Sequence, residues 1–145
     1  MLCEGAGQPI TVTITPGQQH ESTQVDALLD SVAIGGKPGP KRSRFEAISG
    51  DKAYDSQAIR RKLRQRRTKP VIAHRKNRQG EYPPEAAQFD KTLYRQRNVV
   101  ERLIGRLKEN RRIATRYEKQ ADCYRAMILM GFIRIWLKNL LSDTP

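Results

Sequence analysis

The stretch YRQRNVVERLIGRLK, residues 94–108, combines an apolar stripe with a row of charged and polar side chains. At about 100° per residue, one helical face would carry Tyr94, Arg97, Glu101, Lys108 and Arg112. The opposite side would present Val99, Val100, Leu103, Ile104, Leu107 and Ala114. The pattern predicts one amphipathic helix over residues 94–114 that packs with its apolar side. A lone glutamate among arginines is most often a solvated ion-pair partner, so the helix by itself leaves a chemical role open.

The basic residues are confined to one part of the chain. The 145 residues suit one modest domain, residues 1–145, with a formal net charge of +13. Residues 1–36 contain four acids and no Lys or Arg, whereas the remainder carries all 28 Lys and Arg against 11 acids. Such a distribution indicates a polyanionic partner, of which nucleic acid is the commonest. A merely soluble basic surface is the alternative.

No segment predicts export or membrane insertion. Residues 1–8 lack a basic and an apolar region, and the apolar run at 126–137 is shorter than a span and contains Arg134. Cys3 and Cys123 share no metal-binding or disulfide spacing. We therefore expect a soluble protein in the reducing cytoplasm, associated with the nucleoid, and no membrane partner.

The order of periodic segments predicts an α/β layer with a small sheet of about three strands packed by helices. Strands are expected at residues 9–15, 45–49 and 70–73, and helices at 21–32, 55–66, 94–114 and 121–141. Residues 74–93 read as a long basic loop. The last helix, 121–141, is apolar nearly all round, which predicts burial against a sheet face or a partner chain.

Asp51 is the second candidate for chemistry. It follows the predicted strand 45–49 directly after Gly50. Side chains at the carboxyl end of a strand are often functional, because a rigid sheet positions the loops there. A turn or capping role for this aspartate is the alternative.

Four segments resemble one protein family. Tyr94, Arg97, Glu101 and Lys108 fit the pattern YxxRxxxExxxxxxK, which resembles the glutamate signature of transposases of IS5-type insertion sequences. GDKAYDS, residues 50–56, resembles the block that carries the second catalytic aspartate, with Asp51 in that place. TPGQ at residues 15–18 and the run at 112–119 resemble two further family segments, so the similarity covers nearly the whole chain.

The resemblance implies a ribonuclease H-like fold and a triad of two aspartates and a glutamate (DDE). Asp51 and Glu101 would be catalytic and would ligate Mg²⁺ in a two-metal site, which suits carboxylate oxygens. The expected activity is cleavage of double-stranded DNA at element ends and transfer of the freed 3′ end to target DNA. Tyr94, Arg97, Lys108 and Arg112 would contact that DNA.

The chain departs from the family pattern at its start. In the family the first aspartate lies on a central strand ahead of the segment that matches residues 9–18. We therefore expect residues 1–145 to be the C-terminal portion of the catalytic domain, an incomplete ribonuclease H-like domain that is inactive alone. A reading frame joined by frameshifting and a truncated copy both explain this.

The chain would associate with the upstream transposase segment or form a homodimer through the helix 121–141. A non-catalytic basic DNA-binding regulator and a decayed transposase remnant are the alternative functions.

Overall fold

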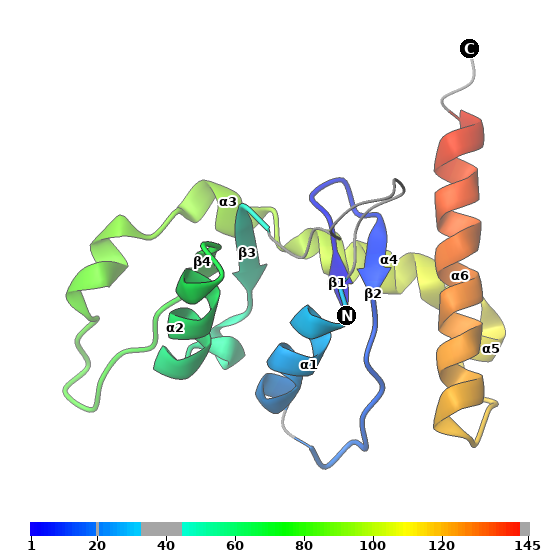
Figure 1. Ribbon diagram of the computed structural model, residues 1–145, viewed down its shortest axis with the longest axis horizontal. Coiled ribbons are helices and arrows are strands. Elements are labelled where there is room, and N and C mark those ends of the chain that lie inside the picture. The colour runs from blue at the N-terminus through cyan, green and yellow to red at the C-terminus, as the bar shows by residue number, and fades with distance from the viewer. Residues whose placement is uncertain (20, 33–44, 143–145) are drawn as a thin grey trace. The chain divides into compact units, whose positions relative to one another are not determined.

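The computed structural model describes residues 1–19, 21–32 and 45–142, and it divides into two compact units. The first unit joins Met1–Val32 to Asn98–Pro145, and the second unit is Ala33–Arg97. Both contain short strands and helices, so the predicted α/β composition is confirmed (Figure 1).

The first unit contains a short antiparallel strand pair and a set of helices. The strands are β1 (Leu2–Cys3) and β2 (Pro9–Thr11), with Leu2 opposite Thr11. The helices are the 3₁₀ helix η1 (Glu21–Gln24), α1 (Val25–Asp30), α4 (Asn98–Lys108), α5 (Arg111–Ala114) and α6 (Ala121–Ser142). The expected strand at 9–15 therefore ends at Thr11, and the expected helix at 21–32 is shorter and begins as a 3₁₀ turn.

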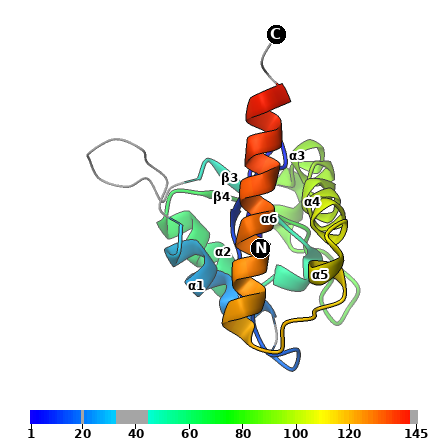
Figure 2. The same ribbon diagram turned by 90° about the vertical axis from the view of Figure 1, so that its right-hand side faces the viewer.

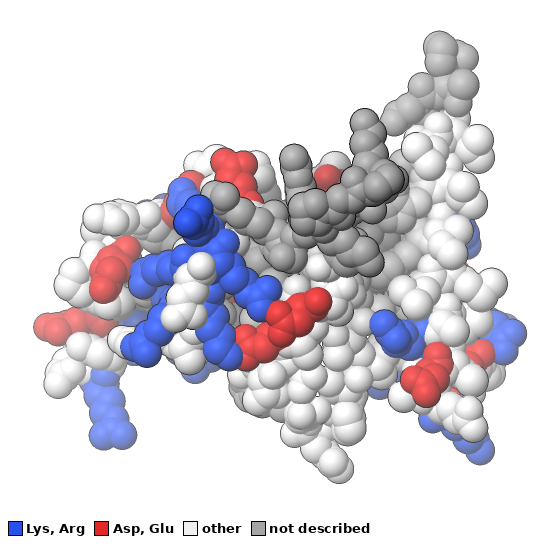
Figure 3. All heavy atoms as spheres, in the orientation of Figure 1, with Lys and Arg blue, Asp and Glu red and all other residues white. Residues whose placement is uncertain are grey.

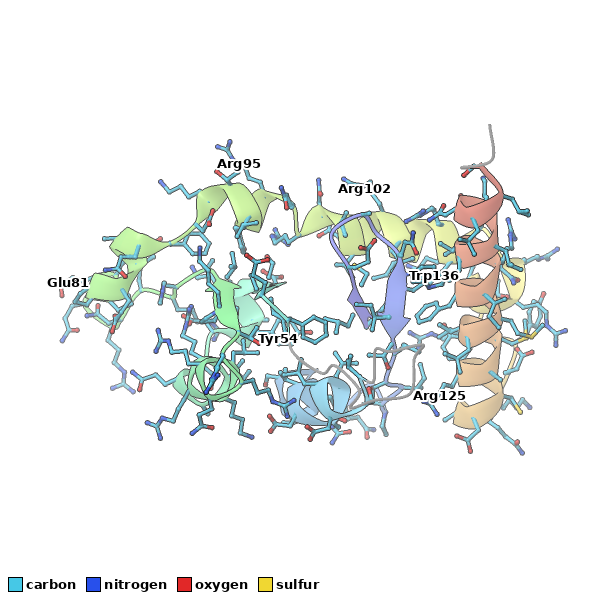
Figure 4. The ribbon with its side chains drawn as sticks, turned by 45° about the horizontal axis from the view of Figure 1, so that its top comes forward. Tyr54, Glu81, Arg95, Arg102, Arg125 and Trp136 are labelled. Carbon is cyan, nitrogen blue, oxygen red and sulfur yellow. The ribbon has the colours of Figure 1, made fainter. Side chains whose placement is uncertain are left out.

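One apolar cluster forms the core of this unit. It contains Val12, Leu103, Leu107, Ile113, Ile128 and Phe132. Polar contacts add to it: Trp136 Nε1 donates to the carbonyl of Pro9 at 2.9 Å, where α6 lies beside β2 (Figure 4). Arg106 Nη2 likewise donates to the carbonyl of Gly7 at 2.7 Å. Residues more than 90 positions apart thereby join the two ends of the chain in one unit.

The second unit is built around two parallel strands. They are β3 (Ala47–Gly50) and β4 (Lys69–Ile72), in a register that places Ser49 opposite Val71. The 3₁₀ helix η2 (Lys52–Tyr54) and α2 (Gln57–Gln65) connect them, and η3 (Pro84–Gln88) and α3 (Lys91–Arg95) follow. Leu63 of α2 and Val71 and Ile72 of β4 are almost fully buried, since α2 covers this strand pair.

Two sequence predictions about the sheets and the loop were wrong. The described residues form two sheets of two strands each rather than one sheet of about three. Residues 74–93, predicted as a loop without structure of its own, contain η3 and the start of α3. Asp90 starts α3, because its side chain accepts a hydrogen bond from the N–H of Leu93 at 3.0 Å.

The predicted single helix over 94–114 was also wrong. A turn at residues 96–97 separates α3 from α4, and Asn110 separates α4 from α5. The Asn110 side chain accepts a hydrogen bond from the N–H of Arg112 at 3.1 Å, which caps a new helix. Short polar side chains of this kind compete with helix continuation. Tyr94, Glu101 and Arg112 therefore lie on three different helices.

The last predicted helix is confirmed as α6, and it is long and continuous (Figures 1 and 2). Few of its side chains are buried as the sequence predicts. Ile128 and Phe132 are buried, while Met130 is 62% and Leu141 is 73% exposed. Among the residues that the structure describes, none of the helices combines the length and hydropathy of a membrane span.

Two glycines allow the packing of the first unit to be tested. A Cβ on Gly131 of α6 would lie 2.8 Å from Leu107 Cδ2 and 3.2 Å from Ile113 Cδ1, whereas one on Gly105 of α4 would meet nothing within 4 Å. We expect Gly131→Ala to destabilise the fold by roughly 1 kcal/mol, because overpacking exceeds the gain in helix propensity. Gly105→Ala should stabilise it by about 0.5–1 kcal/mol.

Urea unfolding followed by circular dichroism measures both free energies of unfolding. If both alanine variants were stabilised equally, the close approach of α6 to Leu107 and Ile113 would be incorrect.

Candidate active site

Asp51 lies at the carboxyl end of β3, as the sequence predicts for this position. Its side chain is exposed and accepts a hydrogen bond from the N–H of Lys52 at 2.6 Å, which makes it the N-cap of η2. The capping role that the sequence left open is therefore present. A carboxylate has about four acceptor sites, so one capping bond leaves further oxygen lone pairs for a cation.

Asp55 and Arg60 form an ion pair next to the turn that carries Asp51. Asp55 Oδ1 accepts from Arg60 Nε at 2.9 Å and lies 2.8 Å from Arg60 Nη2. The two side chains are only 14% and 8% exposed. Asp55 Oδ2 accepts from the backbone N–H of Arg75 at 2.5 Å, so both carboxylate oxygens are bound.

Two guanidinium groups connect this pair to the ends of β4 and η2. Arg60 Nη2 donates to the carbonyl of Ile72 at 2.7 Å. Arg75 Nε donates to the carbonyl of Lys52 at 3.0 Å, and its Nη2 donates to that of Ala53 at 3.4 Å. The turn that carries Asp51 is thus fastened to the end of β4. Figure 4 shows Tyr54 of this turn beside the same strands.

The network changes the titration of Asp55 and His74. Burial by itself raises the pKa of Asp55, but hydrogen bonds from Arg75 and Arg60 and the Arg60 charge outweigh it, and the pKa is lowered. The pKa of His74 is also lowered, first by burial and then by the positive charge of Arg60. At neutral pH the carboxylate is therefore ionised and the imidazole neutral.

Glu101 belongs to the first unit, whereas Asp51 belongs to the second. Glu101 lies in the first turn of α4 with an exposed side chain. Lys108 is exposed at the end of the same helix, seven residues later and hence on the same face. Of the five residues predicted to share one helical face, the structure keeps these two together on one helix.

The other predicted DNA-contacting residues have partners that the sequence did not reveal. The Arg97 guanidinium lies over the Tyr94 ring at 5.0 Å, and the Phe89 ring meets the edge of Tyr94 at a centroid distance of 5.0 Å. Arg112 pairs with Glu118 at 2.6 Å. Arg112 would therefore have to exchange this carboxylate for any other anion.

The donor type of Asp51 and Glu101 suits Mg²⁺, since hard cations prefer carboxylate oxygens. Within the described parts of the chain, however, no group of three or more His, Cys, Asp or Glu side chains could hold a metal ion. The residues described here do not assemble a complete ligand set.

Comparison with known proteins gives the family. Residues 1–136 match the family described as Transposase DDE domain. The chain belongs to this family. The match extends over both units and includes Asp51 and Glu101.

Two relatives of this transposase DDE domain are described as transposases. A putative transposase for insertion sequence element IS402 from Burkholderia cepacia is 31% identical over 132 residues, covering 90% of this chain and 58% of the relative. A putative transposase for insertion sequence element IS6501 from Brucella ovis is 25% identical over 137 residues, covering 94% and 95%. The chain thus spans little more than half the length of the Burkholderia relative. No solved structure matches this chain.

The sequence did not identify Arg60 and Arg75 as residues that hold the turn carrying Asp51. Arg60 is adjacent to Ile59 and within one turn of Leu63, the apolar positions of α2. That adjacency was an available signal of burial. No signal in the sequence connected Arg75 to the Asp51 turn, because the contact spans 23 residues.

We expect Asp55→Asn to lower the free energy of unfolding by about 2–3 kcal/mol at pH 7, because Arg60 would remain buried without its charged partner. The folded-state pKa of Asp55 lies below the unfolded value of about 3.9. Its stabilisation is therefore complete above that value and is lost as the pH falls through the lowered folded-state pKa. The difference between the two proteins should shrink below about pH 4.

Denaturant unfolding at several pH values measures this difference. Glu85→Gln, an exposed acid of the same unit, serves as the control and should change stability by less than about 0.5 kcal/mol. Equal losses in both variants would contradict a specific role of the ion pair.

Proposed function

We propose that this chain acts in DNA transposition as part of a DDE transposase catalytic domain of an IS5-type element. The match of residues 1–136 to the Transposase DDE domain carries the proposal. Both relatives are described as putative transposases for insertion sequence elements. A ribonuclease H-like fold is part of the proposal, and the β3–α2–β4 arrangement of parallel strands and helix is compatible with it.

Asp51 and Glu101 are proposed as the catalytic carboxylates that bind Mg²⁺. The Asp51 turn is held by the Asp55, Arg60 and Arg75 contacts, which gives its carboxylate a fixed position relative to β3. A bound metal ion would stabilise negative charge as a phosphodiester is cleaved or joined. The ligand set would be completed by a third carboxylate beyond these two.

Tyr94, Arg97, Lys108 and Arg112 are proposed to contact double-stranded DNA at element ends and at the target. Lys108 shares a face of α4 with Glu101, so a phosphate near the carboxylate would have a cation beside it. Tyr94 and Arg97 already stack on each other, and Arg112 would leave Glu118 to bind a phosphate. These contacts should weaken steeply as salt rises.

A non-catalytic DNA-binding role is the second candidate. The net charge of +13 supports nucleic-acid binding. Among the described residues, no group of three or more His, Cys, Asp or Glu side chains could hold a metal ion. A regulator that binds element DNA and competes with the complete transposase fits both observations.

The two functions are separated by cleavage assays with Mg²⁺ and duplex DNA that carries the element ends. We expect this chain alone to bind the DNA without cutting it, and cleavage to appear when the upstream segment is supplied as a fused reading frame. Glu101→Gln or Asp51→Asn in the fused protein should lower the cleavage rate by about a thousandfold, since a metal ligand contributes several kcal/mol.

Glu109→Gln, one residue after α4, removes the same charge and serves as the matched control. It should leave the cleavage rate within about twofold of the parent, as an exposed substitution away from the site. Cleavage of the DNA by the chain alone would refute the proposal that its metal-ligand set is incomplete. Full activity of the fused Glu101→Gln protein would refute the assignment of Glu101.

A further inference from the structure

The second unit contains a long stretch of the chain without any acid. From residue 56 to residue 80 there are ten Lys and Arg and no Asp or Glu. Such a run is often a solvated surface, so the three-dimensional arrangement of its cations decides whether it has a binding role.

Three of these ten cations make contacts within the unit. Arg60 pairs with Asp55, Lys69 Nζ pairs with Asp90 at 2.9 Å, and Arg75 binds the carbonyls of η2. A further set of four lies exposed on α2 and just after its end. It consists of Arg61, Lys62, Arg64 and Arg67, all exposed, and is named the α2 basic face.

Helix periodicity explains why the α2 basic face is continuous. The buried positions of α2 are Ile59, Arg60 and Leu63, which lie on one side. At about 100° per residue, Arg61, Lys62 and Arg64 occupy the opposite arc. Figure 3 shows Lys and Arg side chains gathered over this helix. The helix itself contains no acid that could neutralise them.

The dimensions of this face suit a row of phosphates. The nine residues of α2 give a helix about 13 Å long. Arg67 follows its end in a left-handed conformation, with φ 54°, and extends the row of cations. Charge on duplex DNA is spaced by about 3.4 Å of axis along each strand, so several phosphates fall within the reach of these long side chains.

The composition of the face argues against other polyanions. Single-stranded nucleic acid is held largely by aromatic stacking, and the segment from Gln57 to Arg67 contains no Phe, Tyr or Trp. Helices that bind anionic membranes insert large apolar side chains opposite their cations, but Ile59 and Leu63 are buried within the unit. The phosphate backbone of a duplex requires neither feature.

We propose that the α2 basic face binds the phosphate backbone of double-stranded DNA without sequence specificity. This inference rests on the proposed function for its substrate, and it adds DNA-binding residues other than Tyr94, Arg97, Lys108 and Arg112. The face belongs to the unit that carries Asp51, and α2 begins six residues after that aspartate. DNA on this face would therefore be bound by the same compact unit that presents the candidate catalytic carboxylate.

The test is the salt dependence of DNA binding by the full chain in EDTA, measured by fluorescence anisotropy with a labelled duplex. The triple variant Arg61→Gln, Lys62→Gln, Arg64→Gln should bind at least about tenfold more weakly at low salt. The slope of log K against log salt should decrease by about 1 for each phosphate contact removed, hence by about 2–3.

The matched control removes the same charge from exposed positions of α6, with Arg125→Gln, Arg134→Gln and Lys138→Gln. Its slope should change by less than about 1. The charge-conserving variant Arg61→Lys, Arg64→Lys should retain the parental slope, since lysine also binds phosphate. Equal losses in the α2 and α6 variants, with circular dichroism showing both folded, would overturn the proposal.

Two further measurements distinguish duplex DNA from other polyanions and distinguish DNA binding from catalysis. A single strand of the same length, or anionic lipid vesicles, should bind more weakly than the duplex, and tighter binding of either would overturn the assignment to duplex DNA. Because cleavage is absent in EDTA, the outcome is independent of catalysis. The binding result therefore stands or fails separately from the assignment of the catalytic carboxylates.

Discussion

The ion pair between Asp55 and Arg60 organises the part of the chain that carries the candidate aspartate. A unit with two short strands and one covering helix buries little apolar surface, so a charge inside it must be paired. Arg60 meets this requirement by binding Asp55 and the carbonyl of Ile72. Asp55 in turn binds the N–H of Arg75. The first turn of α2, the end of β4 and the turn after β3 are thereby held by one set of hydrogen bonds.

The first unit depends instead on apolar packing. Leu103, Leu107 and Ile113 meet Ile128 and Phe132 of α6, and Gly131 lets the helix approach without a side chain between them. Met127 and Ile135 of α6 are partly buried against this cluster, whereas other large apolar side chains of the helix, among them Met130 and Leu141, are exposed.

The proposed function joins features of both units. Asp51 and Glu101 are the proposed catalytic carboxylates; Lys52 follows the first, and Lys108 shares a helical face with the second. Within the acid-free stretch that contains α2, Arg60 compensates the carboxylate of Asp55. The exposed cations of α2 provide the surface that is proposed for a polyanion.

The sequence by itself determined strands near β2, β3 and β4, helices near α1, α2 and α6, the position of Asp51 after a strand, the placement of Glu101 on a helix and the transposase family. These features rest on local periodicity and short motifs, which the chain carries in consecutive residues. Only the tertiary structure decided that β3 and β4 pair in parallel, that β1 pairs with β2, and that Arg60 is internal. It also decided that α3, α4 and α5 are separate helices. Strand pairing and burial depend on residues distant in sequence, and a single capping side chain such as Asn110 can end a helix without disturbing the apolar period.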